Sequence, residues 1–323
     1  MISELIKESQ LFKSIVKDRL SKRLSHAYLI LGEDTETRKA FVNEISLYLM
    51  CENGGCMECK TCAKVMARTH FDLIFLNEDG KLKTDDLNQL IDYVYIKPAE
   101  AEYKLVFIDN ADGLSDNIQN KLLKLYEEPP ESVIIFMLAR GEAGILRTIK
   151  SRAKTQYLPI FSSKEIYQEL LEEGVEENTA KAAAIISGGQ FDRAYLFSNQ
   201  EGYLEMYNSC VDLLMNLKKS QDVTEYIGSK LFEKDKIEVT LDYFQIIFKD
   251  VLVYISKSNC EYATIGRECD IKEIADGFNE GGVALAILSI VKAKMMLKAN
   301  VSNQSVAESL MLQILEDKYK SKI

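Results

Sequence analysis

The chain has few of the residues that interrupt a polypeptide and no long apolar run. Only 4 prolines and 16 glycines are spread over 323 residues, which leaves no room for a long low-complexity linker. The stretch from Val283 to Val291 is broken by Ser289 and has about half the length of a membrane span. No N-terminal segment combines a basic start, an apolar core and a cleavage site, so we expect no secretion, no membrane association and a cytoplasmic location.

Basic residues are too few to balance the acidic ones. The chain has 40 Lys and Arg against 50 Asp and Glu, which gives a net charge of -10. This balance argues against a large sequence-independent contact with nucleic acid, which needs many Lys or Arg contacts to phosphate. DNA contact inside an assembly stays open, because neighbouring subunits or helix N-termini can supply the positive field.

The most informative absence lies in residues 32–39, which occupy the place of a nucleotide-binding loop between an apolar run and an amphipathic helix. A working loop reads G-x-x-x-x-G-K-[ST]. Its second Gly lets the backbone wrap phosphate, its Lys reaches the terminal phosphates and its hydroxyl holds magnesium. Gly32 is present, but the last three positions hold Thr37, Arg38 and Lys39. The loop is degenerate, and we expect no ATP in this site.

The first 160 residues alternate strand and helix patterns, which predicts an α/β domain with helices on both faces of a parallel sheet. A helix capped by Ser115 is expected to end at Glu127-Glu128-Pro129-Pro130, because proline lacks a donor and restricts the residue before it. All but the last of the expected strands are nearly all apolar, as in strands covered on both faces. They are 27–31, 73–76, 104–108, 133–138 and 154–158.

Helical patterns replace strands in the second half of the chain. Gly174 and Gly188-Gly189 are expected to end two short helices, and long helical patterns follow from about Gly202. The fold class is therefore α/β followed by all-α. We predict three domains: an α/β domain at 1–161, a small helical domain at 162–201 and a helical bundle at 202–323.

Four of the seven cysteines, Cys51, Cys56, Cys59 and Cys62, are spaced C-x4-C-x2-C-x2-C. This spacing indicates a structural zinc ion in a tetrahedral thiolate site. Gly54-Gly55 permits the turn that brings Cys51 to the other three. Reduced thiols, a redox C-x-x-C pair and an iron–sulfur cluster are the alternatives.

The remaining candidate ligands are interpreted as structural residues. His70 is eight residues beyond Cys62 and is expected to make a local hydrogen bond rather than to bind the metal. Cys210, Cys260 and Cys269 are isolated, and we expect them to be small buried apolar residues.

Two further positions bear on ATP chemistry. The apolar strand 104–108 ends in Asp109, where an ATPase would hold magnesium, but the next residue is Asn110, whose amide cannot take a proton. We interpret Asp109 as structural. Ser151 and Arg152 precede the last strand, and a guanidinium that reaches a neighbour's phosphate raises a rate by about 10³–10⁵-fold. Spacing alone favours a solvated surface arginine at 152.

Several motifs occur together in an order that resembles a known family, the delta-prime subunits of bacterial DNA polymerase III clamp loaders, which are AAA+ relatives. The resemblance covers most of the first 200 residues, and Asn300–Asn303 with Glu308 more weakly resembles the family's collar domain. The motifs are Arg23–Leu29, the four-cysteine insert, Ile108–Asp112, Asn120–Lys124, Glu127–Pro130 and Ser151-Arg152.

The resemblance implies an AAA+-like sheet domain with a zinc module, a small helical lid and a C-terminal collar in a pentamer. It implies an accessory subunit of the polymerase holoenzyme without catalytic activity of its own. Arg152 would be an arginine finger directed at ATP on an adjacent gamma or tau subunit, with Ser151 positioning it. The implied partners are the gamma/tau and delta subunits, the sliding clamp indirectly, and primer–template DNA in the assembled complex.

The sequence departs from the family pattern at three places. Ala153 replaces a cysteine, Leu138-Ala139-Arg140 lacks a polar sensor, and Arg193 is one residue out of register for a second sensor, with Asp192 in its place. One alternative is an independent AAA+ ATPase that uses Arg38 or Lys39 as a phosphate ligand. Another is a stand-alone zinc-containing nucleic-acid binder, which the acidic charge disfavours.

Overall fold

The chain divides into two units. The computed structural model describes residues 2–78, 80, 82, 84–199, 203–234, 236–257 and 267–320. The first unit is Met1–Ser162 with Gln190–Asp192, and the second is Ser163–Gly189 with Arg193–Ile323. The predicted boundary at 201–202 lies outside the described residues, and the division into three domains stays a prediction.

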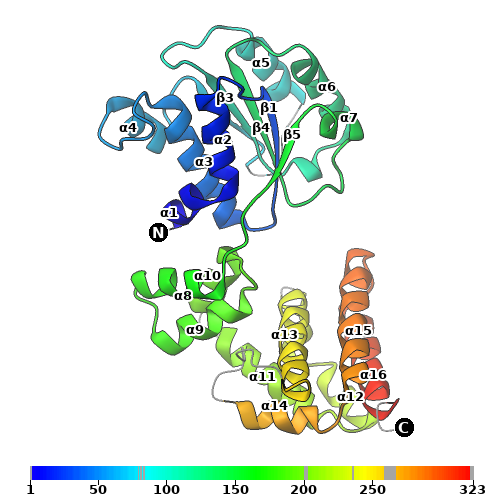
Figure 1. The fold of residues 1–323 in the computed structure, drawn as a ribbon. Coiled ribbons are helices and arrows are strands. Elements are labelled where there is room, and N and C mark those ends of the chain that lie inside the picture. The colour runs from blue at the N-terminus through cyan, green and yellow to red at the C-terminus, as the bar shows by residue number, and fades with distance from the viewer. Residues whose placement is uncertain are drawn as a thin grey trace. The chain divides into compact units, whose positions relative to one another are not determined.

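The first unit contains a parallel sheet of five strands in the order β2-β3-β4-β1-β5 (Figure 1). Each predicted strand is confirmed to within one residue at its ends, and the α/β class with a helical C-terminal part is confirmed. The strands are β1 Ala27–Leu31, β2 Leu73–Leu76, β3 Lys104–Ile108, β4 Val133–Ala139 and β5 Lys154–Tyr157.

One face of this sheet carries a row of aromatic rings that crosses four strands. Tyr28, Phe136, Phe107 and Phe75 lie directly opposite one another in the strand register. Their ring centroids are 5.1, 5.0 and 5.6 Å apart in that order, and each pair is stacked. Phe41 meets Phe136 edge-on at 6.1 Å, so the helix that carries Phe41 covers this face.

The opposite face packs on a separate apolar cluster, which includes Leu29, Val106, Ile135, Leu90 and Leu122. Both faces of the sheet are therefore buried, as the apolar runs predict. Two helices that precede β1, α1 and α2, were not predicted. The helices of this unit are α1 Ile2–Glu8, α2 Gln10–Leu20, α3 Thr35–Met50, α4 Lys60–Met66, α5 Thr84–Val94, α6 Asp116–Glu127 and α7 Arg147–Lys150, with a 3-10 turn at Ala111–Gly113.

The predicted helix ends are largely found. Helix α6 ends at Glu127, before the two prolines. Ser115 holds the position before α6, but its side chain makes no capping hydrogen bond, so that part of the prediction is wrong. Gly174 and Gly188 have φ values of 85° and 62°, the left-handed conformation expected after a helix.

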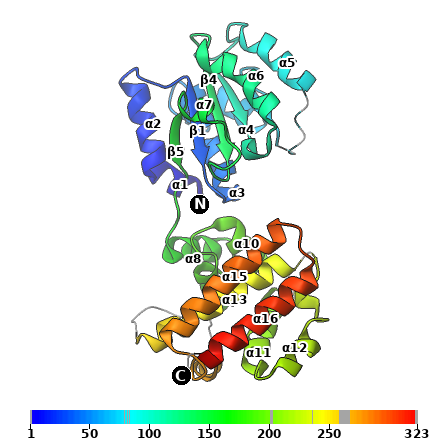
Figure 2. The same cartoon turned by 90° about the vertical axis from the view of Figure 1, so that its right-hand side faces the viewer.

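The second unit is helical throughout its described residues. Helices α13, α15 and α16 pack together in it (Figure 2). No single described helix is long and apolar enough to cross a membrane, although Cys269–Ala275 and Glu280–Lys298, bent by 99°, pass on length and composition when taken together. The helices are α8 Ser163–Glu172, α9 Glu177–Ile186, α10 Phe191–Asn199, α11 Tyr203–Asn216, α12 Ser220–Tyr226, α13 Ile237–Ile255, α14 Glu268–Ala275, α15 Glu280–Lys298 and α16 Asn303–Lys320, with a 3-10 turn at Lys230–Phe232. The first two residues of α10, Phe191 and Asp192, belong to the first unit.

Candidate functional site

The degenerate loop is short, because α3 begins only four residues after the end of β1. Asp34 occupies the N-cap of α3, and its Oδ1 accepts hydrogen bonds from the amides of Glu36 at 3.1 Å and Thr37 at 3.3 Å. The hydroxyl of Thr37 donates to Asp34 Oδ2 at 2.6 Å. The amide of Arg38 donates to the carbonyl of Asp34 at 3.0 Å. The amides of Glu36 and Thr37 are donors that a phosphate would need at a helix N-terminus, whereas the amide of Arg38 makes the first regular hydrogen bond of the helix.

A distant segment completes this arrangement. The amide of Thr35, the first of α3, donates to Asp192 Oδ2 at 3.4 Å. The amides of Phe191 and Asp192, at the start of α10, donate in turn to the carboxylate of Asp34 at 2.6 and 3.1 Å. The amides of residues 35–38 are thus all paired within the chain.

Gly32 matches the first glycine of a phosphate loop but serves packing in this structure. A Cβ at this position would lie 2.7 Å from the side chain of Leu158, which follows β5. The amide of Leu158 donates to the carbonyl of Leu31 at 2.8 Å, which fixes the close approach. Lys39 is exposed and pairs with Glu36 at 2.8 Å.

Arg38 stands at the position of the phosphate-loop lysine but points to a carboxylate of its own chain. Its side chain is 3% exposed, and its Nε lies 3.7 Å from Oδ1 of Asp109. Nη2 donates to Thr35 Oγ1 at 3.4 Å. Nε and Nη1 have no hydrogen-bond partner in the part of the chain that the structure describes. The guanidinium supplies the positive charge beside the carboxylate that would hold magnesium in an ATPase.

The space beside this ion pair is small. A cavity of about 20 Å³ is lined by Arg38, Lys39, Asp109 and Leu138 among others. This volume accommodates about one water molecule, whereas pockets for small ligands measure about 300–1,000 Å³.

Arg193, the residue near a second sensor position, forms an ion pair with Asp242, in which Nη2 and Oδ2 are 3.7 Å apart.

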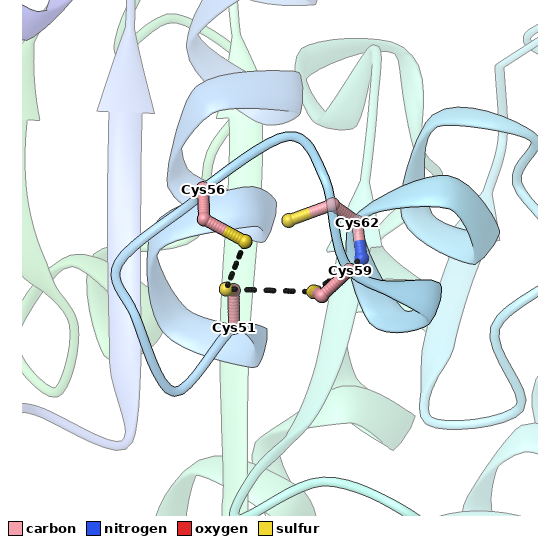
Figure 3. Close-up of side chains that lie close together, drawn as sticks. All are labelled: Cys51, Cys56, Cys59 and Cys62. Atoms are coloured by element: carbon pink, nitrogen blue, oxygen red, sulfur yellow. Dashed lines mark hydrogen bonds between the residues drawn. The ribbon is translucent and has the colours of Figure 1, made fainter.

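The four clustered cysteines converge on one point (Figure 3). Their sulfur atoms all lie within 4.8 Å of one another. The distances from Cys51 Sγ to Cys56 Sγ and to Cys59 Sγ are both 3.7 Å. A tetrahedron with metal–sulfur bonds of about 2.3 Å has an edge of about 3.8 Å, so the cluster fits a metal ion with four thiolates.

The backbone around this cluster also suits a thiolate site. Gly54 and Gly55 have φ values of 67° and 93°, so the turn predicted before Cys56 is confirmed. Burial by itself raises the pKa of Cys51, but amides of Cys56, Gly55 and Asn53 lower that pKa to about 6. Burial raises the pKa of Cys62 to about 12, so a metal must displace its proton.

The other candidate ligands are not part of the group formed by the four clustered cysteines. His70 accepts a hydrogen bond at Nδ1 from the amide of Asp72 at 3.2 Å, which confirms the predicted local role. Burial lowers the pKa of His70, so its ring is held neutral. Cys210 is buried as predicted, but Cys269 is exposed on α14, because it falls on the outer side of that helix, and this prediction is wrong. Cys260 lies outside the described residues.

Arg152 lies just beyond α7, and its side chain is 38% exposed. Its Nη1 donates to the carbonyl of Thr148 at 3.1 Å and to the hydroxyl of Ser151 at 3.4 Å. Its Nη2 lies 2.8 Å from Oε1 of Glu127. The hydroxyl of Ser151 donates to Thr148 at 2.9 Å. The guanidinium therefore sits at the surface, and among the described residues its partners come from its own turn and from the end of α6.

Sequence analysis missed a buried glutamine that supports this turn. Gln119 is fully buried, and its amide donates to the carbonyls of Leu114 at 3.0 Å and Gly144 at 2.6 Å. Its Oε1 accepts from the amide of Leu146 at 2.9 Å, directly before α7. The available signal was a polar residue three positions before Leu122, on the apolar side of α6.

The fold and these sites define an α/β domain with a parallel five-stranded sheet and a degenerate phosphate loop, followed by a helical unit. Residues 7–161 match the family described as DNA polymerase III, delta subunit. The resemblance to delta-prime subunits is confirmed.

Two relatives by sequence are DNA polymerase III subunits. The chain is 27% identical to DNA polymerase III subunit delta' of Bacillus subtilis over 95% of its length and 94% of that protein. It is 30% identical to DNA polymerase III subunit tau of Escherichia coli over 46% of the chain, an alignment that covers 24% of that longer protein. A DNA polymerase III gamma subunit-related protein of Thermotoga maritima aligns over 98% of both chains with a TM-score of 0.41 and 17% identity.

Proposed function

We propose that this chain is a non-hydrolysing subunit of a bacterial DNA polymerase III clamp loader that supplies Arg152 in trans to ATP on a neighbouring subunit. The proposed partners are the gamma/tau and delta subunits. In this proposal the chain acts in the cytoplasm, contributes indirectly to loading the sliding clamp and meets primer–template DNA only in the assembled complex. The observation that carries the proposal is the pairing of the α3 amides with Asp34 and Asp192.

The first support is that the chain's own site lacks what ATP requires. The helix N-terminus that would bind phosphate already holds a carboxylate, and Arg38 is directed at Asp109. A carboxylate that is paired with a buried guanidinium is a poor ligand for Mg²⁺, since the cation would have to enter beside another positive charge. An ATPase function in this chain would need both features to rearrange.

The second support is the placement of Arg152. A trans-acting finger has to be at the surface and has to leave its resting partners at low cost. Arg152 and Glu127 are 38% and 49% exposed, and such pairs contribute only about 0.2–1 kcal/mol. The planar guanidinium also matches phosphate better than a lysine would. Ser151, which accepts from Nη1, is proposed to position it.

The cysteine cluster supports a structural rather than catalytic metal. Four thiolates complete a tetrahedral shell and leave no position for water or substrate. We propose Zn²⁺, bound by Cys51, Cys56, Cys59 and Cys62, as the ion that holds α3 to α4.

Residues 162–201 are proposed to form the lid and residues 202–323 the collar. Helix α15 exposes large apolar side chains at a helical spacing, as expected of a surface that packs on other subunits. Beside them is a cavity of about 250 Å³ lined by residues of α15 and α16. The exposed side chains are Leu285, Leu288, Val291 and Met295.

The test is an ATPase assay of the clamp loader reconstituted from this chain and its gamma/tau and delta partners. Arg152→Ala should leave assembly intact and reduce turnover at the one site it completes by about 10³-fold or more. Arg147→Ala, which removes an exposed arginine of the same turn, is the matched control. Unchanged DNA-stimulated turnover in an assembled Arg152→Ala complex would exclude the finger.

The alternative, an independent ATPase, is tested on the isolated chain. It requires Arg38 or Lys39 to reach phosphate, but Arg38 is buried against Asp109 and Lys39 pairs with Glu36. We expect no magnesium-dependent ATP turnover by the isolated chain. Micromolar ATP affinity with such turnover would favour the alternative.

A further inference from the structure

The carboxylate of Asp34 has more donors than a helix cap needs. Asp34 is only 6% exposed. Oδ1 accepts from the amides of Glu36, Thr37 and Asp192, and Oδ2 accepts from the amide of Phe191 and the hydroxyl of Thr37. Donors therefore reach it from the first turns of two helices, α3 and α10.

An ordinary cap in the same chain shows the difference. Glu176 caps α9, and its carboxylate accepts from the amide of Thr179 at 2.9 Å and from the Thr179 hydroxyl at 3.1 Å. Both donors belong to the helix that Glu176 caps. Asp34 also accepts hydrogen bonds from the amides of Phe191 and Asp192, which are separated from it by 157 and 158 positions in the sequence. The amides of Phe191 and Asp192, which belong to the first unit, therefore add to the amides of α3 at the same anion.

We propose that the Asp34 carboxylate is a built-in substitute for a phosphate group. It fills the position that a bound phosphate would take at the start of α3, and it satisfies the amides of Phe191 and Asp192 at the same time. This inference deepens the proposed function, because it names the group that keeps nucleotide out of this site. The adjacent guanidinium of Arg38 adds to the positive surroundings of the site, with Nη2 bound to Thr35.

A consequence concerns the segment 190–192. In a site that binds nucleotide, such a segment would gain or lose an anion as the nucleotide exchanges. Here the anion is covalently attached to the chain, so the contact of Phe191 and Asp192 with the loop does not depend on nucleotide.

The inference is tested by chemical rescue in the full-length chain. Asp34→Ala removes the internal anion, and we expect Tm to fall by about 5 °C or more, because several buried amides lose their acceptor. Inorganic phosphate should then restore at least half of the loss with saturable, millimolar dependence. Sodium chloride at equal ionic strength should restore none of it.

Three controls separate specific binding from the general stabilisation that phosphate gives to proteins. Wild type and Glu176→Ala should gain only the general increment. Asp34→Asn, which keeps an oxygen and fills the space, should be less stable than wild type and should not be rescued. If Asp34→Ala does not fold in chloride, recovery of folded protein on refolding in phosphate replaces the Tm measurement.

The outcomes separate the two proposals. Equal increments for all four proteins, or rescue by acetate but not by phosphate, would overturn the assignment of Asp34 as a phosphate substitute. Neither result involves Arg152 or a partner subunit, so neither bears on the finger. Conversely, failure of the Arg152→Ala assay leaves the rescue result standing.

Discussion

Arg152 and Glu127 form an ion pair in which Nη2 and Oε1 are 2.8 Å apart. The sequence marks Glu127 only as the last residue before a helix stop, and helix α6 indeed ends there. In space it becomes the acidic partner of the proposed finger. The pair joins the end of α6 to the turn after α7, so the guanidinium has a defined resting position in the free chain.

Replacing Glu127 should make the Arg152 guanidinium more available. For Glu127→Gln we expect phenylglyoxal to modify Arg152 about two- to fivefold faster, the range that corresponds to the loss of an exposed ion pair. The modification rate is measured by peptide mass analysis. Glu128→Gln, which changes the next carboxylate, should leave the rate unchanged. Equal rates in wild type and Glu127→Gln would show that the pair does not restrain the side chain.

The Arg38–Asp109 pair should behave as a structural unit. Asp109→Ala leaves a buried guanidinium without its counter-charge and should lower the free energy of unfolding by about 3 kcal/mol. Arg38→Met with Asp109→Ala should recover most of this loss, since an apolar side chain of similar length fills the space. Urea unfolding of the two single variants and the double variant measures the coupling. Additive losses would contradict it.

The cysteine cluster should lose its metal when two ligands are removed. Cys56→Ser with Cys59→Ser should abolish bound zinc, measured by elemental analysis, and lower Tm by several degrees because the thiolate site forms only with folding. Cys269→Ser, a change at an exposed cysteine, is the control. A chelator should bring wild type to the Tm of the double variant. Unchanged Tm under chelation would argue against a structural metal.

Asp72 predicts a pH dependence of stability. Burial raises its pKa, but the amides of Ala99, Glu100 and Ala101 outweigh burial and hold the pKa below the usual value. Because the folded pKa is depressed, the contribution is complete above the unfolded pKa of about 3.9 and is lost as pH falls through the folded pKa.

Asp72→Asn should therefore lower stability at pH 7 by about 1–3 kcal/mol, the effect of weakening hydrogen bonds to a buried charged group. The difference from wild type should stay constant from about pH 7 to pH 5 and shrink below about pH 4. Urea unfolding across this range measures it. A difference that grows on acidification would contradict the sign.

Much of the fold was predictable because its signals are local. The β1 and β3 strands are buried on both faces, so each is a short apolar run that stands out from its surroundings. The cysteine spacing and Gly54-Gly55 likewise specify a four-sulfur site within one short segment. Helices α1 and α2 were missed because no motif marked them, and the unbonded Ser115 shows that a favourable capping residue does not by itself make the cap.

The sequence by itself determined that the phosphate loop is degenerate, that four thiols share one segment and that an arginine precedes the last strand. Only the tertiary structure decided which groups occupy the degenerate phosphate loop and pair with Asp109. The carboxylate of Asp34 accepts hydrogen bonds from the amides of Phe191 and Asp192, and Arg38 pairs with Asp109. These residues are too far apart in the sequence for a local pattern to predict the contacts. The physical reason is that the sequence gives the type of each polar side chain but not its partners. Those partners are selected only when folding places the side chain in a buried hydrogen-bonded network.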